Sequence, residues 1–83
     1  MWPEWWDWEL AFTGYLELRM EQRGFSELDL RSMLQQARGY SPSVVEGRFM
    51  IETRPRDRPW IVIVEPDPDQ RRLVIVTAYE VTR

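Results

Sequence analysis

Residues 60–81, WIVIVEPDPDQRRLVIVTAYEV, form the most apolar part of the chain and decide its fold. Two runs of β-branched and aliphatic residues, 61–64 and 73–76, flank a segment rich in proline, aspartate and arginine. This pattern predicts a β-hairpin whose strands are residues 60–65 and 73–81. Because both faces of the second strand are apolar up to Thr77, we expect it to lie in the middle of a sheet. A period of two predicts its faces: Val74, Val76 and Ala78 on one, and Leu73, Ile75, Thr77, Tyr79 and Val81 on the other.

The start of the chain carries four tryptophans within its first eight residues. From Trp6 on, apolar and polar residues alternate, which predicts a half-buried strand over residues 6–13. The residues before it, Met1 to Trp5, are expected to form a loose N-terminal arm. The tryptophans have three explanations, namely core packing, a surface for a partner or a second copy, and stacking on nucleotide bases.

Two helices are predicted next. Thr13 is the expected N-cap of a helix over residues 14–23, which Gly24 ends. Ser26 is the expected N-cap of a second helix, and Asp29 completes a variant of the capping box. The second helix is expected to run to Gly39 and to pack a narrow apolar stripe on the sheet, made of Leu30, Met33, Leu34 and Ala37.

The middle of the chain predicts one more strand. Turn formers prevail in residues 40–47, and residues 48–54, RFMIETR, alternate as a strand does. The following RPRDRP is a loop, because Pro55 and Pro59 lack the N–H that a ladder needs. The predicted order is therefore β-α-α-β-β-β. We expect a single α+β domain over residues 1–83, with two helices packed on a four-stranded antiparallel sheet. The partner of the first strand stays open between the third and the fourth strand.

The composition excludes several classes of chemistry. The chain has no cysteine and no histidine, so it lacks a thiolate or imidazole metal site, a Ser-His-Asp triad and a Cys-His pair. Glu65, Asp67 and Asp69 lack the glycine bend and the spacing of a calcium loop, and we expect no metal and no cofactor. There is no apolar run near the ~20 residues that span a bilayer and no signal peptide, so we expect no membrane association and a cytoplasmic location.

Arginine, tyrosine and carboxylate side chains remain as candidates for function. Tyr15, Arg19 and Arg23 recur at i, i+4 and i+8 and share one side of the predicted first helix. The alternative is an ordinary solvated face, since glutamates lie nearby. Four arginines lie within eleven residues around the loop, which indicates a local anion-binding surface or simply a soluble loop: Arg48, Arg54, Arg56 and Arg58. The net charge of −3 argues against broad phosphate binding.

Four motifs resemble a known family: RMEQRGFSELDLRSML, EGRFMIETR, WIVIVEP and LVIVTAY. They are similar to a family of small bacterial domains related to the RelE and BrnT ribonuclease toxins, and the similarity runs over residues 8–81. The resemblance implies the fold expected above. It also implies metal-independent RNA cleavage by attack of the ribose 2′-hydroxyl on the adjacent phosphate, with RNA and an antitoxin as partners.

The resemblance also implies roles for particular residues. Arg48, Tyr79 and Tyr15 would be catalytic, with Tyr15 standing where related sequences are expected to carry histidine. Arg19, Arg23 and Arg54 would bind the substrate. A second function stays open beside the ribonuclease: a non-catalytic module of the same fold that binds a protein partner or forms a homodimer.

Overall fold

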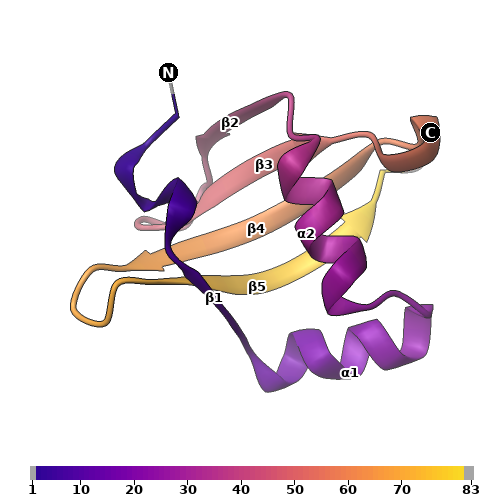
Figure 1. Ribbon diagram of the computed structural model, residues 1–83, viewed down its shortest axis with the longest axis horizontal. Helices are drawn as coiled ribbons and strands as arrows, with labels where there is room; N and C mark the ends of the chain where they lie inside the picture. Colours follow the sequence, from indigo (N-terminus) through magenta and orange to yellow (C-terminus); the bar gives the residue numbers. More distant parts are fainter. Residues whose placement is uncertain (1, 82–83) are drawn as a thin grey trace.

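The fold is α+β, which confirms the predicted class, but the sheet differs from the expected one. A computed structural model describes residues 2–81 as two helices and a five-stranded mixed sheet in the order β1-β5-β4-β3-β2 (Figure 1). The strands are β1 (Glu9–Phe12), β2 (Gly39–Pro42), β3 (Phe49–Thr53), β4 (Trp60–Asp67) and β5 (Arg72–Glu80). The helices are α1 (Gly14–Arg23) and α2 (Glu27–Gln35), and the short 3₁₀ helices are η1 (Glu4–Asp7) and η2 (Pro55–Asp57).

The predicted hairpin is β4 and β5, paired antiparallel at the centre of the sheet. Its inner face forms the core together with β3 and the two helices. The fully buried side chains in it include Leu16, Leu30, Ile51, Val62, Val64, Leu73 and Ile75. The predicted faces of β3 are confirmed, because Ile51 and Thr53 are buried and Glu52 is exposed.

The predicted faces of β5 are wrong beyond Ile75. The ladder shifts between Ile63 and Val64, so that Val64 pairs with Ile75 whereas Ile63 pairs with Thr77. A bulge of this kind inserts one extra residue into a strand and breaks the period of two. As a result Ala78 joins Leu73 and Ile75 in the core. Thr77 and Tyr79 lie with Val74 on the opposite face of the sheet, here called the open face.

The helix caps agree with the sequence. The Thr13 hydroxyl accepts a hydrogen bond from the Leu16 N–H at 3.0 Å, and Gly24 ends α1 with a φ of 70°. Ser26 and Asp29 form the complete capping box at the start of α2. The expected end of the second helix at Gly39 is wrong, because α2 ends at Gln35 and the chain turns into β2.

The sheet has a fifth strand and is not fully antiparallel. Residues 40–47 were expected to be a turn, but Gly39–Pro42 pairs with β3 as an edge strand. Serine and proline are poor strand formers, and β2 is held by its pairing with β3 rather than by local preference. β1 lies parallel to β5, with Leu10 opposite Leu73, which settles the open pairing of the first strand. The expected antiparallel four-stranded sheet is therefore corrected to a mixed five-stranded one.

The tryptophan segment packs against the sheet instead of extending as a strand. Residues 4–7 form η1, so the strand expected from Trp6 begins only at Glu9. The Trp2 and Trp6 rings stack with centroids 4.5 Å apart, and the Trp5 ring lies 5.1 Å from that of Phe49. The expected loose arm, Met1 to Trp5, is thus packed from Trp2 on, and Met1 lies outside the described residues.

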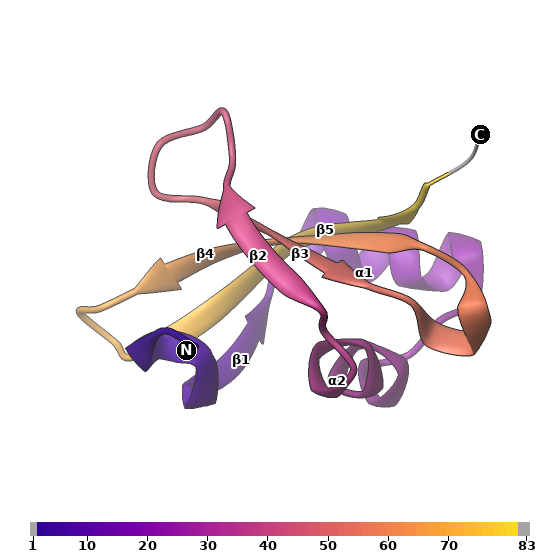
Figure 2. The same ribbon diagram turned by 90° about the horizontal axis from the view of Figure 1, so that it is seen from above.

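The first helix runs along the edge of β5 that β1 leaves free (Figure 2). The side chains of its N-cap and of its last residue donate to carbonyl oxygens of that edge: Thr13 to Val76 at 3.2 Å and Arg23 to Ala78 at 3.3 Å. The second helix covers the inner face of the sheet, and the Thr53 hydroxyl donates to the Met33 carbonyl at 2.6 Å. Neither helix covers the open face.

Candidate functional site

A groove of about 720 Å³ lies between α2 and η2 and is here called the arginine groove. It lies over the end of the sheet where β4 begins and β5 ends. One wall comes from α2, the other from the loop that contains η2, and the end of α1 closes it. Its lining consists of Arg23, Gly24, Phe25, Asp29, Ser32, Met33, Gln36, Pro55, Arg56, Arg58, Trp60 and Glu80. A volume in this range is typical of ligand sites.

The loop wall has an unusual backbone. Arg56 and Asp57 are consecutive residues in the left-handed region, with φ of 54° and 63°. Non-glycine residues seldom adopt this conformation, and they persist where the surrounding structure holds them in place. Pro55 directly precedes this pair, and Pro59 follows it after Arg58. The Arg54 guanidinium also donates to the Asp57 carbonyl at 3.3 Å. The Arg56 and Arg58 side chains therefore project from a loop whose shape is set in advance.

The floor of the arginine groove is apolar. The Phe25 and Trp60 rings meet edge to face, with centroids 5.5 Å apart and planes at 72°. Phe25 is 9% exposed, whereas Trp60 is only half-buried. Trp60 therefore offers an uncovered part of its indole to the groove.

Three guanidinium groups and two carboxylates set the charge of the arginine groove. Asp29 is committed to the capping box, where its carboxylate accepts from the Ser26 N–H at 2.8 Å. Arg58 and Glu80 approach to 3.8 Å, and the Arg58 side chain is 71% exposed. Arg56 makes no side-chain hydrogen bond or ion pair with any residue between 2 and 81. The groove thus carries one more cation than anions. Among the described residues Arg58 has an ion pair, Arg23 donates to the Ala78 carbonyl at 3.3 Å, and Arg56 has no side-chain partner.

The six predicted site residues do not form one site. The Arg48 guanidinium pairs with the Glu65 carboxylate at 3.0 Å. Arg48 lies just before the start of β3, whereas Tyr79 of β5 lies level with the other end of β3. The β3 residue level with Tyr79 is Glu52, so Arg48 lies about 13 Å away along the strand direction alone. Of the six, Arg23 lines the arginine groove and Arg48 does not.

The other predicted residues pair locally. The Arg19 Nε donates to the Tyr15 hydroxyl at 3.0 Å, and its guanidinium lies 5.0 Å from the Tyr15 ring centroid. Tyr79 is 38% exposed on the open face. Arg54 supports the loop backbone as described above. Their catalytic and substrate-binding roles stay predictions.

Sequence reasoning found only part of the arginine groove. The density of arginine around RPRDRP indicated an anion-binding surface, and Arg56 and Arg58 do line the groove. Trp60 and Glu80 were not singled out, because each reads as an ordinary strand residue. The feature that brings these two residues together is the pairing of β4 with β5, which places Trp60 opposite Glu80.

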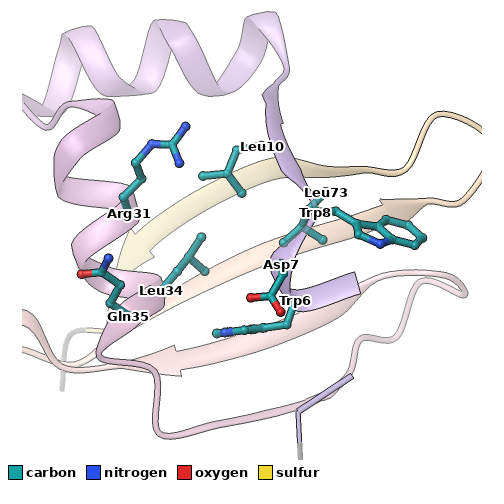
Figure 3. A pocket seen from close by; sticks show the side chains of 8 residues that line it. All are labelled: Trp6, Asp7, Trp8, Leu10, Arg31, Leu34, Gln35 and Leu73. Atoms are coloured by element: carbon teal, nitrogen blue, oxygen red, sulfur yellow. The ribbon is translucent and has the colours of Figure 1, made fainter. Parts of the chain in front are cut away.

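A second hollow of about 260 Å³ lies on the other side of α2, between this helix and the start of the chain (Figure 3). We call it the tryptophan cavity. Figure 3 shows the Trp6 indole and the Asp7 carboxylate on one side and Arg31 on the other. Its lining consists of Trp6, Asp7, Trp8, Leu10, Arg31, Leu34, Gln35 and Leu73.

The described residues offer no cluster of three or more acidic side chains that could hold a metal ion. No helix within residues 2–81 has the length and apolar character needed to cross a membrane.

Comparison with known proteins identifies a family. The model of a family described as Domain of unknown function (DUF4258) matches residues 12–80. The matched span contains every residue that lines the arginine groove, but it leaves out Trp6, Asp7, Trp8 and Leu10 of the tryptophan cavity. No curated protein and no solved structure matches the chain.

Proposed function

The chain belongs to the DUF4258 family, and from its arginine groove we propose that it is a toxin-like domain that binds RNA there. The observation that carries this proposal is that three arginines, from α1 and the η2 loop, line one groove with an aromatic floor. Guanidinium groups bind phosphate oxygens through charged hydrogen bonds. The net charge of −3 restricts such binding to this local surface.

The same groove offers the groups for metal-independent cleavage, the activity implied by the resemblance to RelE and BrnT toxins. The ribose 2′-oxygen must lose its proton to a base and attack the adjacent phosphorus, after which the bond to the 5′-oxygen breaks and water protonates the leaving oxygen. Glu80 is the candidate base, because Asp29, the other carboxylate of the groove, is held in the capping box. Arg23, Arg56 and Arg58 would stabilise the charge that develops on the phosphate.

The test is a binding and cleavage assay with a labelled single-stranded RNA. We expect the double variant Arg56→Ala/Arg58→Ala to lower the affinity at least tenfold. Its matched control is Arg31→Ala/Arg71→Ala, where Arg31 lines the tryptophan cavity and the Arg71 guanidinium lies 5.7 Å from the ring centroid of Trp8. This control removes the same charge and is expected to change affinity less than twofold. An equal loss of RNA affinity in both double variants would show that charge attracts RNA non-specifically, and this result would contradict the proposal. In the cleavage assay, the Glu80→Gln variant should still bind RNA but form no cleavage product. If the wild-type protein forms no product either, only the RNA-binding part of the proposal remains.

A second candidate function is the non-catalytic protein-binding or self-associating module. The observation that favours it is the open face, whose central strands carry apolar side chains that no helix covers: Met50, Ile61, Ile63 and Val74, with Thr77 and Tyr79 beside them. Uncovered apolar patches of this kind mark interaction surfaces. Self-association through this face predicts a dimer in light scattering that Ile63→Glu dissociates. A wild-type monomer that captures no antitoxin-like protein partner would count against the module.

A further inference from the structure

The floor of the arginine groove indicates which part of a nucleic acid it would hold. We infer that the groove takes one unpaired nucleotide, with its base against Trp60 and its phosphate at Arg56 and Arg58. The inference rests on the proposed function, since it specifies the ligand of the same groove.

The aromatic floor distinguishes this groove from a surface that binds phosphate alone. Trp60 is packed on one side by Phe25, edge to face at 5.5 Å, and this contact fixes the orientation of the indole. The indole remains half-buried and lines the groove. A fixed, partly uncovered ring is a platform for stacking by a base, because every base has a flat π-face.

The cations lie on the loop that borders this platform. Arg56 and Arg58 are separated by one residue and flanked by prolines, so both guanidinium groups belong to one short, strained segment. Glu80 neutralises part of the charge of Arg58, at 3.8 Å, and Arg56 is left for an anion. Because the backbone is already held in shape, binding a phosphate there requires little ordering of the loop.

The opposite wall can contact the edge of a base. Ser32 and Gln36 of α2 line the groove, and the Gln36 amide donates to the Ser32 hydroxyl at 3.1 Å. Their remaining donor and acceptor positions face a ligand that lies between α2 and the loop. A base inside a duplex is already stacked and paired, so it cannot reach such a floor without leaving the helix. A volume of about 720 Å³ matches a single nucleotide rather than a duplex.

The experiment compares adenosine 5′-monophosphate with ribose 5-phosphate, which carries the same phosphate without a base. We expect wild-type protein to bind the nucleotide about tenfold tighter by calorimetry and Trp60→Leu to bind both equally. Trp60→Phe should retain most of the preference, and thermal unfolding of both variants checks that they fold. Arg56→Ala should weaken both ligands alike. Equal affinities in wild-type protein, or an unchanged preference in a folded Trp60→Leu variant, would overturn the inference.

A second arm separates this inference from the proposed function. A single-stranded RNA and the same sequence closed in a hairpin stem are compared for wild-type and Trp60→Leu protein. Binding of both RNAs with no effect of Trp60→Leu leaves RNA binding intact and removes the nucleotide site. If the protein binds the mononucleotide but neither RNA, the nucleotide site is supported and the proposed RNA-binding function is contradicted.

Discussion

The two hollows that flank α2 differ in how their charges and their backbone are held. In the tryptophan cavity, Arg31 is paired with Glu27 one helical turn away, at 3.0 Å, and the lining comes from α2, from β1 and β5, and from the aromatic segment at η1. In the arginine groove, Arg56 is unpaired among the described residues, and it lies on a loop with two consecutive left-handed residues. The arginine groove therefore retains an unpaired cation and a strained loop, whereas the tryptophan cavity retains one buried group without a hydrogen-bond partner among the described residues, the Trp8 indole N–H.

This difference indicates that the two flanks of α2 have different roles. The aromatic rings around η1 bury surface and cover the edge of the sheet, which stabilises a chain too small to bury more than roughly 60–65% of the surface its unfolded form exposes. The arginine groove also contains packed core residues, Phe25 and Met33, but its loop wall holds two consecutive left-handed residues. Backbone strain of this kind clusters at sites that act on a ligand. Together with the proposed function, this difference predicts a stabilising role for the flank at η1 and a binding role for the arginine groove.

The largest expected effect lies on the stabilising flank. Trp5→Ala removes the ring that packs on Phe49 and Tyr40, with centroids 5.1 and 5.9 Å apart. Truncation of a buried aromatic ring costs 3–5 kcal/mol, and because Trp5 is only half-buried we expect a loss of about 2–3 kcal/mol. Urea denaturation measures it, and RNA affinity should stay within twofold of wild type. A large loss of affinity with unchanged stability would reverse the assignment of the two flanks.

The anchor of α2, shared by both flanks, gives the next effect. Thr53 is 1% exposed, and its hydroxyl donates to the Met33 carbonyl at 2.6 Å. Thr53→Val keeps the shape and leaves that carbonyl without its side-chain donor, so we expect a loss of about 1–2 kcal/mol in the free energy of unfolding. Thr53→Ser, which retains the hydroxyl, is the matched control and should lose less. A Val variant as stable as wild type would show that the hydrogen bond does not anchor the helix.

A gain in stability is expected from the strained loop. Asp57 has a φ of 63°, and glycine adopts this region without a steric cost. Asp57→Gly should therefore raise the free energy of unfolding by about 0.5–1 kcal/mol, measured by thermal unfolding. If the loop shape serves binding, the more flexible variant should also bind RNA more weakly. Lower stability would mean that the aspartate side chain supports the loop, contrary to the contrast drawn above.

The smallest expected effect on stability is that of Arg31, whose charge is already paired within α2. Arg31→Ala breaks an i,i+4 pair with Glu27 whose side chains are 49% and 50% exposed. Pairs of this kind contribute about 0.3–0.5 kcal/mol, so stability should change by no more than this and RNA affinity should not change. An Arg31 variant that loses affinity as strongly as an Arg56 variant would erase the distinction between the two hollows.

Local patterns predicted much of the fold, because they depend on neighbouring residues alone. Thr13, Gly24 and the Ser26 capping box mark helix ends through hydrogen bonds within a few residues, and they are where the sequence placed them. The hairpin followed from its apolar runs. The bulge in β5 could not be predicted, because the stability of a bulge depends on how β4 and β5 pair and pack together. For the same reason the edge strand β2 and the parallel pairing of β1 were missed.

The candidate site divides along the same line. Composition by itself determined that histidine and cysteine chemistry is absent and that arginine supplies every basic side chain. The clustering of arginine in RPRDRP pointed to an anion-binding surface, and two of those arginines do line the groove. The tertiary structure decided that Arg48 and Tyr79 lie at opposite ends of the sheet and that Arg23, Trp60 and Glu80 meet at one end of it. The reason is physical: residue type and local spacing are written in the chain, whereas the meeting of α1, β4 and β5 depends on strand register and on a bulge that no local pattern encodes.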